Sequence, residues 1–329
     1  MNCMSYEIVA TLGPGAQSVS IWEQMVAAGV SAFRLNTSHL SLAQTLAWLE
    51  RLQSFFAAQR PGLAVVLDLQ GSKWRLGDFP ACELRQGQVV QLILAAAAEE
   101  PDVLPLPHAD FFRAALPGAR LSLNDAKVYL QVEQAQADRL LARVIQGGAL
   151  GPRKGITLAE DHSAYRLEAL NARDSEIFAA TRSLGFVRYA ISYLKDGVEM
   201  ERYRQLFGPS VFLIAKLERQ SALESVSQIA AFADQLWLCR GDLGAELGAK
   251  AMAQAVYRFG QALPNCPRTA LLAGQVLEHM TDHPTPTRSE VCFLHDALQA
   301  GYGGVVLSDE TALGRYPVEA CQVAAMFNN

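Results

Sequence analysis

The chain has 329 residues, of which 50% are hydrophobic and 19% charged, which is enough for one large core and a smaller second domain. Its formal net charge of −5, without a basic run, argues against nucleic acid or an anionic membrane as the main partner. The six cysteines form no Cys-x-x-Cys pair and the N-terminus shows no leader pattern, so we expect reduced thiols, no signal peptide, no spanning helix and a cytoplasmic location.

Short apolar runs alternate with helical patterns through most of the chain. The helical patterns include Ser20–Ala28 and Leu42–Ala58, where apolar residues recur at helical spacing. Eight strand–helix units predict a TIM (β/α)8 barrel, and a doubly wound open sheet is the alternative that strand count alone leaves open. The predicted strands are Ile8–Leu12, Ala32–Asn36, Ala64–Leu69, Val187–Ile191, Val211–Lys216, Leu236–Cys239, Thr269–Ala273 and Val305–Leu307.

The alternation of strands and helices fails between about residues 78 and 154. Val89–Leu94 and Lys127–Val132 alternate like antiparallel strands, and Gly and Pro punctuate the gaps between such runs. We therefore predict a small β-rich lid domain, residues 78–154, inserted after the third barrel strand. The barrel domain is then formed by residues 1–77 and 155–329.

Charged residues end two neighbouring predicted strands. The period of a strand puts Lys216 and Glu218 on one side of the chain, and the next strand delivers Asp242. Two carboxylates with free coordination positions can hold magnesium, and a nearby lysine can stabilise a developing enolate or a phosphoryl oxygen. A structural ion pair would explain either motif alone, but their repetition at successive strand ends favours chemistry.

Polar residues also follow the second and third predicted strands. Arg34, Asn36 and Ser38 share one side of the chain, which suits phosphate binding by the arginine and cation ligation by the other two. Asp68 ends an apolar run, where burial without a partner is costly, and Arg75 is a second phosphate candidate. Taken in isolation, a helix cap by Ser38 or Thr37 explains the first segment better, and an ordinary surface hairpin is the alternative for the second.

These residues belong to motifs with the order and spacing of a known family. The chain resembles pyruvate kinase over nearly all its length, and together the motifs make chance similarity remote. The matching segments are Ile8–Pro14 (IVATLGP), Arg34–His39 (RLNTSH), Asp68–Arg75 (DLQGSKWR), Gly147–Leu158 (GGALGPRKGITL), Ile214–Glu218 (IAKLE), Arg240–Gly244 (RGDLG), Gln275–Met280 (QVLEHM), Pro284–Glu290 (PTPTRSE) and Leu307–Pro317 (LSDETALGRYP).

The resemblance implies a barrel with a mobile β lid and assigns a role to each matching position. Lys216 would stabilise the enolate and the transferring phosphoryl group, which Arg34 would also contact. Glu218 and Asp242 would bind Mg2+ or Mn2+, and the backbone amides of Gly241 and Asp242 would hold the substrate carboxylate.

The resemblance also implies a monovalent-cation pocket and a nucleotide site. The pocket would consist of the side chains of Asn36, Ser38 and Asp68 and the carbonyl group of Leu69. The residues expected to contact ADP or ATP are Pro14, His39, Arg75 and Lys154.

Three departures from the family pattern change these expectations. Lys73 stands where potassium-dependent members carry glutamate, so its ammonium is expected to replace the potassium ion. Gly274, in the substrate region, replaces a threonine on the route that protonates the enolate carbon, so either Ser308 or a water takes over that step or the carbon chemistry differs. The sequence ends at Asn329, so we expect no C-terminal regulatory domain.

The leading hypothesis is a magnesium-dependent phosphotransferase that converts phosphoenolpyruvate and ADP to pyruvate and ATP, or a close variant. A 2-oxo acid lyase or decarboxylase could use the same metal site, but would give His39, Arg75 and Lys154 no role. A weakened regulator that binds nucleotide or oxo acid is the third reading. The expected partners are ADP or ATP, a small 2-oxo or enol acid, and a second copy bound through the barrel domain.

Overall fold

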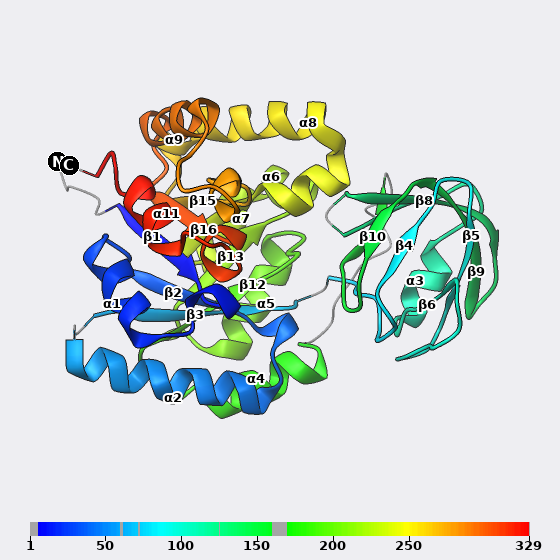
Figure 1. The fold of residues 1–329 in the computed structure, drawn as a ribbon, viewed down its shortest axis with the longest axis horizontal. Coiled ribbons are helices and arrows are strands. Elements are labelled where there is room, and N and C mark those ends of the chain that lie inside the picture. The colour runs from blue at the N-terminus through cyan, green and yellow to red at the C-terminus, as the bar shows by residue number, and fades with distance from the viewer. Residues whose placement is uncertain (1–5, 60–61, 72, 125, 160–169, 329) are drawn as a thin grey trace.

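The barrel strands close on themselves in the computed structural model, which describes residues 6–59, 62–71, 73–124, 126–159 and 170–328. The eight strands are parallel, and β1 pairs with both β2 and β16. A closed ring confirms the predicted (β/α)8 barrel and excludes the open sheet (Figure 1). Their bounds are β1 Glu7–Thr11, β2 Ala32–Asn36, β3 Ala64–Leu69, β12 Val187–Ile191, β13 Leu213–Leu217, β14 Gln235–Cys239, β15 Ala270–Ala273 and β16 Gly304–Leu307.

Helices surround the barrel and cover its outer face. Both faces of the strands are buried, which explains why the strands are apolar throughout rather than alternating. Trp237 and Val306 belong to an inner cluster, while Trp22, Phe33 and Leu294 belong to the larger cluster that includes helix residues. The helices are α1 Val19–Ala27, α2 Leu42–Gln59, α4 Ala172–Thr181, α5 Gly197–Phe207, α6 Gln220–Glu224, α7 Val226–Phe232, α8 Arg240–Ala262, α9 Arg288–Ala300, α10 Asp309–Ala312 and α11 Pro317–Ala324, with short 3₁₀ turns η1 Pro14–Ala16, η2 Thr37–His39, η3 Leu263–Asn265 and η4 Glu278–Thr281. None of the described helices is long and apolar enough to cross a membrane.

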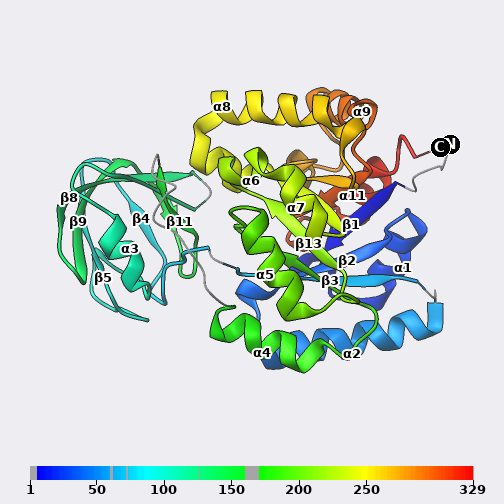
Figure 2. The same ribbon diagram turned by 180° about the vertical axis from the view of Figure 1, so that it is seen from behind.

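A second, β-rich domain lies to one side of the barrel (Figure 2). It has its own core, which includes Val90, Phe111 and Leu130. One sheet has the order β11-β7-β8-β9-β5-β6, and β4 pairs with β10 in a second sheet. The elements are β4 Cys82–Leu84, β5 Val89–Ile93, β6 Val103–Pro105, α3 Ala109–Ala114, β7 Arg120–Leu123, β8 Val128–Ala135, β9 Arg139–Gln146, β10 Gly148–Leu150 and β11 Ile156–Ala159.

The two chain crossings between the domains run side by side. Arg75 and Gly155 form an antiparallel bridge, and the amide of Leu76 donates to the carbonyl oxygen of Lys154 at 2.9 Å. The core of the second domain includes Trp74, and its sheet includes β11, which begins after residue 154. The domain limits given above stay a prediction, and we call residues 73–78 and 152–156, where the two crossings lie side by side, the hinge segments.

Candidate active site

A cavity of about 610 Å³ lies where the carboxyl ends of the barrel strands face the second domain. In TIM barrels the strand ends on this face carry the functional residues. The second domain contributes Lys127, Tyr129 and Gln146 to the wall. The sequence-predicted residues in the wall are Arg34, Asn36, Ser38, His39, Asp68, Lys73, Arg75, Lys154, Lys216, Glu218, Gly241, Asp242, Gly274 and Ser308, whereas Pro14 and Leu69 do not line the cavity.

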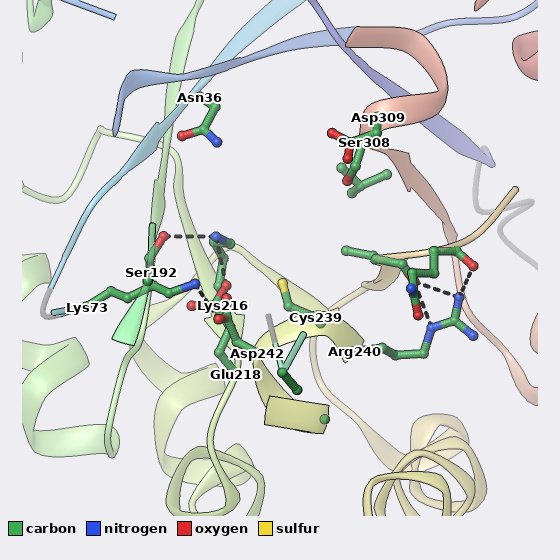
Figure 3. A pocket seen from close by; sticks show the side chains of 18 of the residues that line it. Asn36, Lys73, Ser192, Lys216, Glu218, Cys239, Arg240, Asp242, Ser308 and Asp309 are labelled. Carbon is green, nitrogen blue, oxygen red and sulfur yellow. Dashed lines mark hydrogen bonds and ion pairs between the residues drawn. The ribbon is translucent and has the colours of Figure 1, made fainter. Parts of the chain in front are cut away.

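Lys216 is the centre of a buried group of charges (Figure 3). Its Nζ lies 2.8 Å from Glu218 Oε1 and 3.0 Å from Asp68 Oδ1, and donates to Ser192 Oγ at 2.8 Å. Burial lowers the pKa of the Lys216 ammonium, but Asp68 and then Glu218 raise it more, so the net pKa is above its ordinary value. The lysine is therefore a fixed positive charge in a site shielded from water.

Arg34 is the second cation of this group. Its Nε and Nη2 atoms both donate to Asp68 Oδ2, at 2.8 and 2.5 Å, and its Nη1 donates to Thr11 Oγ1 at 2.9 Å. Burial raises the pKa of the Asp68 carboxyl, but Lys216 and Arg34 lower it more, so the net pKa is below its usual range. Asp68 is thus ionised, and both of its oxygens have cationic partners.

Glu218 and Asp242 lie close enough to interact electrostatically. Burial raises the pKa of Glu218, Lys216 lowers it and Asp242 raises it, with a net upward shift. The amide of Tyr193 donates to Glu218 Oε2 at 2.6 Å, while Asp242 lies in the first turn of α8. Among the described residues no group of three or more His, Cys, Asp or Glu is placed to hold a metal, so a divalent ion here would need substrate oxygens as further ligands.

Lys73 lies in the cavity wall, and its ammonium forms an ion pair with Asp242 Oδ1, the proposed metal ligand. Its role as a replacement for a monovalent cation stays a prediction. Figure 3 shows the Lys73 side chain pointing towards Asp242 and Glu218, while Asn36 projects from another part of the wall. In the monovalent-cation pocket itself, Asn36 Oδ1 accepts from the amide of Ser38 at 3.2 Å.

A cluster of cations lines the side of the cavity where nucleotide binding is expected. Burial, and then Arg75 and Lys154, lower the pKa of His39 to about 4, so this histidine is neutral at pH 7. Arg75 is fixed at the hinge because its Nη1 donates to the carbonyl oxygen of Arg153 at 3.0 Å. Arg75 and Lys154 would therefore offer positive charges to a polyphosphate, beside the neutral imidazole of His39.

Gly274 has a backbone conformation that explains its departure from the family threonine. Its φ is +83°, a region that favours glycine, and an added Cβ would lie 3.1 Å from the amide nitrogen of Gly241. Arg240 holds the turn, donating to the carbonyl oxygen of Gly274 from Nε at 2.9 Å and to that of Gln275 at 2.7 Å.

Replacing Gly274 with Ala is therefore expected to destabilise the protein by about 1 kcal/mol or more, because the residue must keep a positive φ. Gly185→Ala is the matched control, since nothing lies within 4 Å of its added Cβ and its φ is not positive. The measurement is the free energy of unfolding in urea. Equal stability of the two variants would contradict the assigned strain.

The sequence analysis gave no role to several residues of the wall, among them Ser192, Cys239 and Arg240. Ser192 donates to Asp68 Oδ1 at 2.9 Å and accepts from Lys216, so it links the two charges. It directly follows β12, so the strand-end rule could have found it. Arg240 directly follows β14 and lies in the RGDLG motif, so the same rule could have found it, whereas Cys239, the last residue of an apolar strand, gives no polar signal.

Comparison with known proteins agrees with this geometry. The family model of the pyruvate kinase barrel domain matches residues 4–321. The chain belongs to the pyruvate kinase family. It is 32% identical over 320 residues to a pyruvate kinase of Agrobacterium vitis, which covers 96% of this chain and 66% of that relative. A pyruvate kinase of Aeropyrum pernix is 32% identical over 98% of the chain, and one of Mycobacterium tuberculosis is 30% identical over 95%. The chain spans about two thirds of the length of these relatives.

Proposed function

We propose that the protein is a magnesium-dependent phosphotransferase of pyruvate kinase type, acting between phosphoenolpyruvate, or a closely related enol acid, and ADP. The observation that carries the proposal is the buried Lys216 ammonium, held between Glu218 and Asp68 at the mouth of the barrel. A lysine that contacts two carboxylates in a substrate-sized cavity is suited to stabilise an enolate oxygen and a phosphoryl oxygen at once.

The surrounding residues would each handle one part of the substrate. The free amides of Gly241 and Asp242, at the start of α8, would accept the carboxylate of the enol acid. Arg34 lines the cavity, where Asp68 holds its guanidinium in place. From there it would balance negative charge on the phosphoryl group. Glu218 and Asp242 would hold Mg2+, which, when bound, would withdraw electrons from the reacting oxygens.

The nucleotide would lie against His39, Arg75 and Lys154, which line the same cavity. The positive charges of Arg75 and Lys154, and that of Lys127 on the lid, would bind the phosphates of ADP, while His39 is neutral. The protonation of the enolate carbon needs a donor other than the family threonine, and Ser308 is the hydroxyl that lines the cavity near Gly274. Its amide donates to Glu310 Oε2 at 2.7 Å, which fixes the start of α10.

The alternatives differ from this proposal in their need for nucleotide. A 2-oxo acid lyase or decarboxylase would leave His39, Arg75 and Lys154 unused, and a regulator would bind ligands without turnover. An assay that couples pyruvate formation to NADH oxidation, with phosphoenolpyruvate, ADP and Mg2+, separates the three. Turnover that depends on ADP supports the proposal, and pyruvate formation without ADP, or no turnover, contradicts it. The expected homodimer and cytoplasmic location stay predictions.

We expect this activity not to require potassium. Asp68, the carboxylate of the proposed pocket, is already compensated by Arg34 and Lys216, so a potassium ion would gain little electrostatic energy there. Rates in tetramethylammonium buffer, with and without added KCl, should agree within about twofold. Strong activation by KCl would contradict this.

A further inference from the structure

Lys73 lies where the barrel leaves β3 for the second domain, yet its charge reaches α8. The lysine follows the last residue of β3, Leu69, by four positions in the sequence. Its ammonium pairs with Asp242 Oδ1, and the side chains of Lys73 and Asp242 are only 7% and 14% exposed. One side chain therefore joins the hinge of the second domain to a proposed metal ligand on the barrel.

Gly155, in the other hinge segment, leaves room for the stem of this lysine. A Cβ added at Gly155 would lie 2.4 Å from Lys73 Cε and 3.0 Å from its Nζ. The backbone of Gly155 is fixed by its bridge to Arg75 and by the amide of Asn124, which donates to its carbonyl oxygen at 3.1 Å. The side chain of Lys73 thus passes against the backbone of Gly155, and any residue with a Cβ at position 155 would displace that side chain.

The ion pair matters because Glu218 and Asp242 repel each other. Lys216 compensates Glu218, whose other oxygen accepts from the amide of Tyr193. Lys73 in turn compensates Asp242. A divalent ion held by the two carboxylates would share the Asp242 carboxylate with the Lys73 ammonium, and two cations on one carboxylate oppose each other.

We propose that Lys73 is a tethered cation that competes with the divalent ion for Asp242, so that the ion binds tightly only together with an anionic substrate. This rests on the proposed function, because it takes Glu218 and Asp242 as the metal ligands. A substrate anion adds oxygen ligands to the metal and gives the displaced ammonium a new partner. Lys73 thereby couples the order in which the metal and the substrate bind to the segment that connects the barrel with the second domain.

The test is a titration with Mn2+ in which the electron paramagnetic resonance signal of the free aqueous ion reports binding directly, without turnover. Lys73→Met should bind Mn2+ about tenfold or more tightly than the wild type in the absence of oxalate. Gly155→Ala keeps the charge but displaces the flexible end of the lysine, and should also tighten binding, by a smaller factor. Lys127→Met removes the same charge from the lid side of the cavity and should stay within about twofold of wild type.

Measurements with oxalate then distinguish failure of the proposed competition from failure of the proposed metal site. With saturating oxalate, the wild type and Lys73→Met should bind Mn2+ within about threefold of each other. Unchanged or weaker binding by Lys73→Met without oxalate would overturn the competition and make Lys73 a support for Asp242. Absence of Mn2+ binding to every variant, even with oxalate, would overturn the metal site itself and with it the proposed function. Tightening by Lys73→Met but not by Gly155→Ala would overturn the role of the hinge glycine in placing the ammonium.

Discussion

Replacing Lys216 with Met is expected to lower the rate of phosphoryl transfer by ~10²-fold or more, since it removes a preorganised charge from a site shielded from water. The side chain is 10% exposed and contacts Asp68, Glu218 and Ser192, so no water can take over its position without rearrangement of all three. Single-turnover rates with saturating phosphoenolpyruvate and ADP measure the effect.

The same change also tests a purely structural role for the lysine. Loss of Lys216 leaves Glu218 and Asp68 with fewer positive partners, so Lys216→Met should also lower the unfolding free energy, by roughly 3–5 kcal/mol as for other broken buried pairs. Lys216→Arg separates the two roles, because it keeps the charge but moves its position. A catalytic lysine predicts a large loss of rate in Lys216→Arg with a small loss of stability. Near-wild-type rates in Lys216→Arg would favour a structural strut.

The sequence predicted the barrel well because each of its strands is buried on both faces and reads as a short apolar run. The fifth predicted strand shows the limit of that signal, since Val211 and Phe212 continue the apolar run but the strand begins at Leu213. Apolar side chains before a strand pack just as well as those within it. The boundary of a strand is decided by its hydrogen bonds to neighbouring strands, and a single sequence does not show these bonds.

The active-site cavity was predictable for a similar reason. Parallel strands in a barrel end on one face, so polar residues at strand ends such as Asn36, Asp68 and Glu218 are brought together by topology alone. The partner of Lys73 was not predictable, because a four-carbon stem can reach several carboxylates, and the room that Gly155 leaves for that stem is visible only in the structure.

Glu218→Gln is expected to weaken Mn2+ binding in the presence of oxalate by at least about 100-fold. Loss of a residue that only orients a metal ligand typically weakens metal binding by about 10- to 100-fold, so a direct ligand should have the larger effect. The glutamine has nearly the same shape and can still accept from the amide of Tyr193, and Lys216 keeps Asp68 as a partner, so the loss of stability should be smaller than in Lys216→Met. Glu278→Gln is the matched control, because Glu278 lines the same cavity and its substitution removes the same charge. The measurement is again the signal of free aqueous Mn2+.

The size of this effect follows from the small number of protein ligands. With two carboxylates as the proposed ligands, Glu218 supplies half of the protein's charge at the ion, whereas a distant carboxylate acts only through a screened field. The variant therefore also tests the pairing of Glu218 with Lys216. If Glu218 served only to hold that lysine, Glu218→Gln would bind Mn2+ and oxalate as Glu278→Gln does and would lose rate alone. Equal Mn2+ affinity in the two variants would thus remove Glu218 from the metal site and leave it as a partner of Lys216.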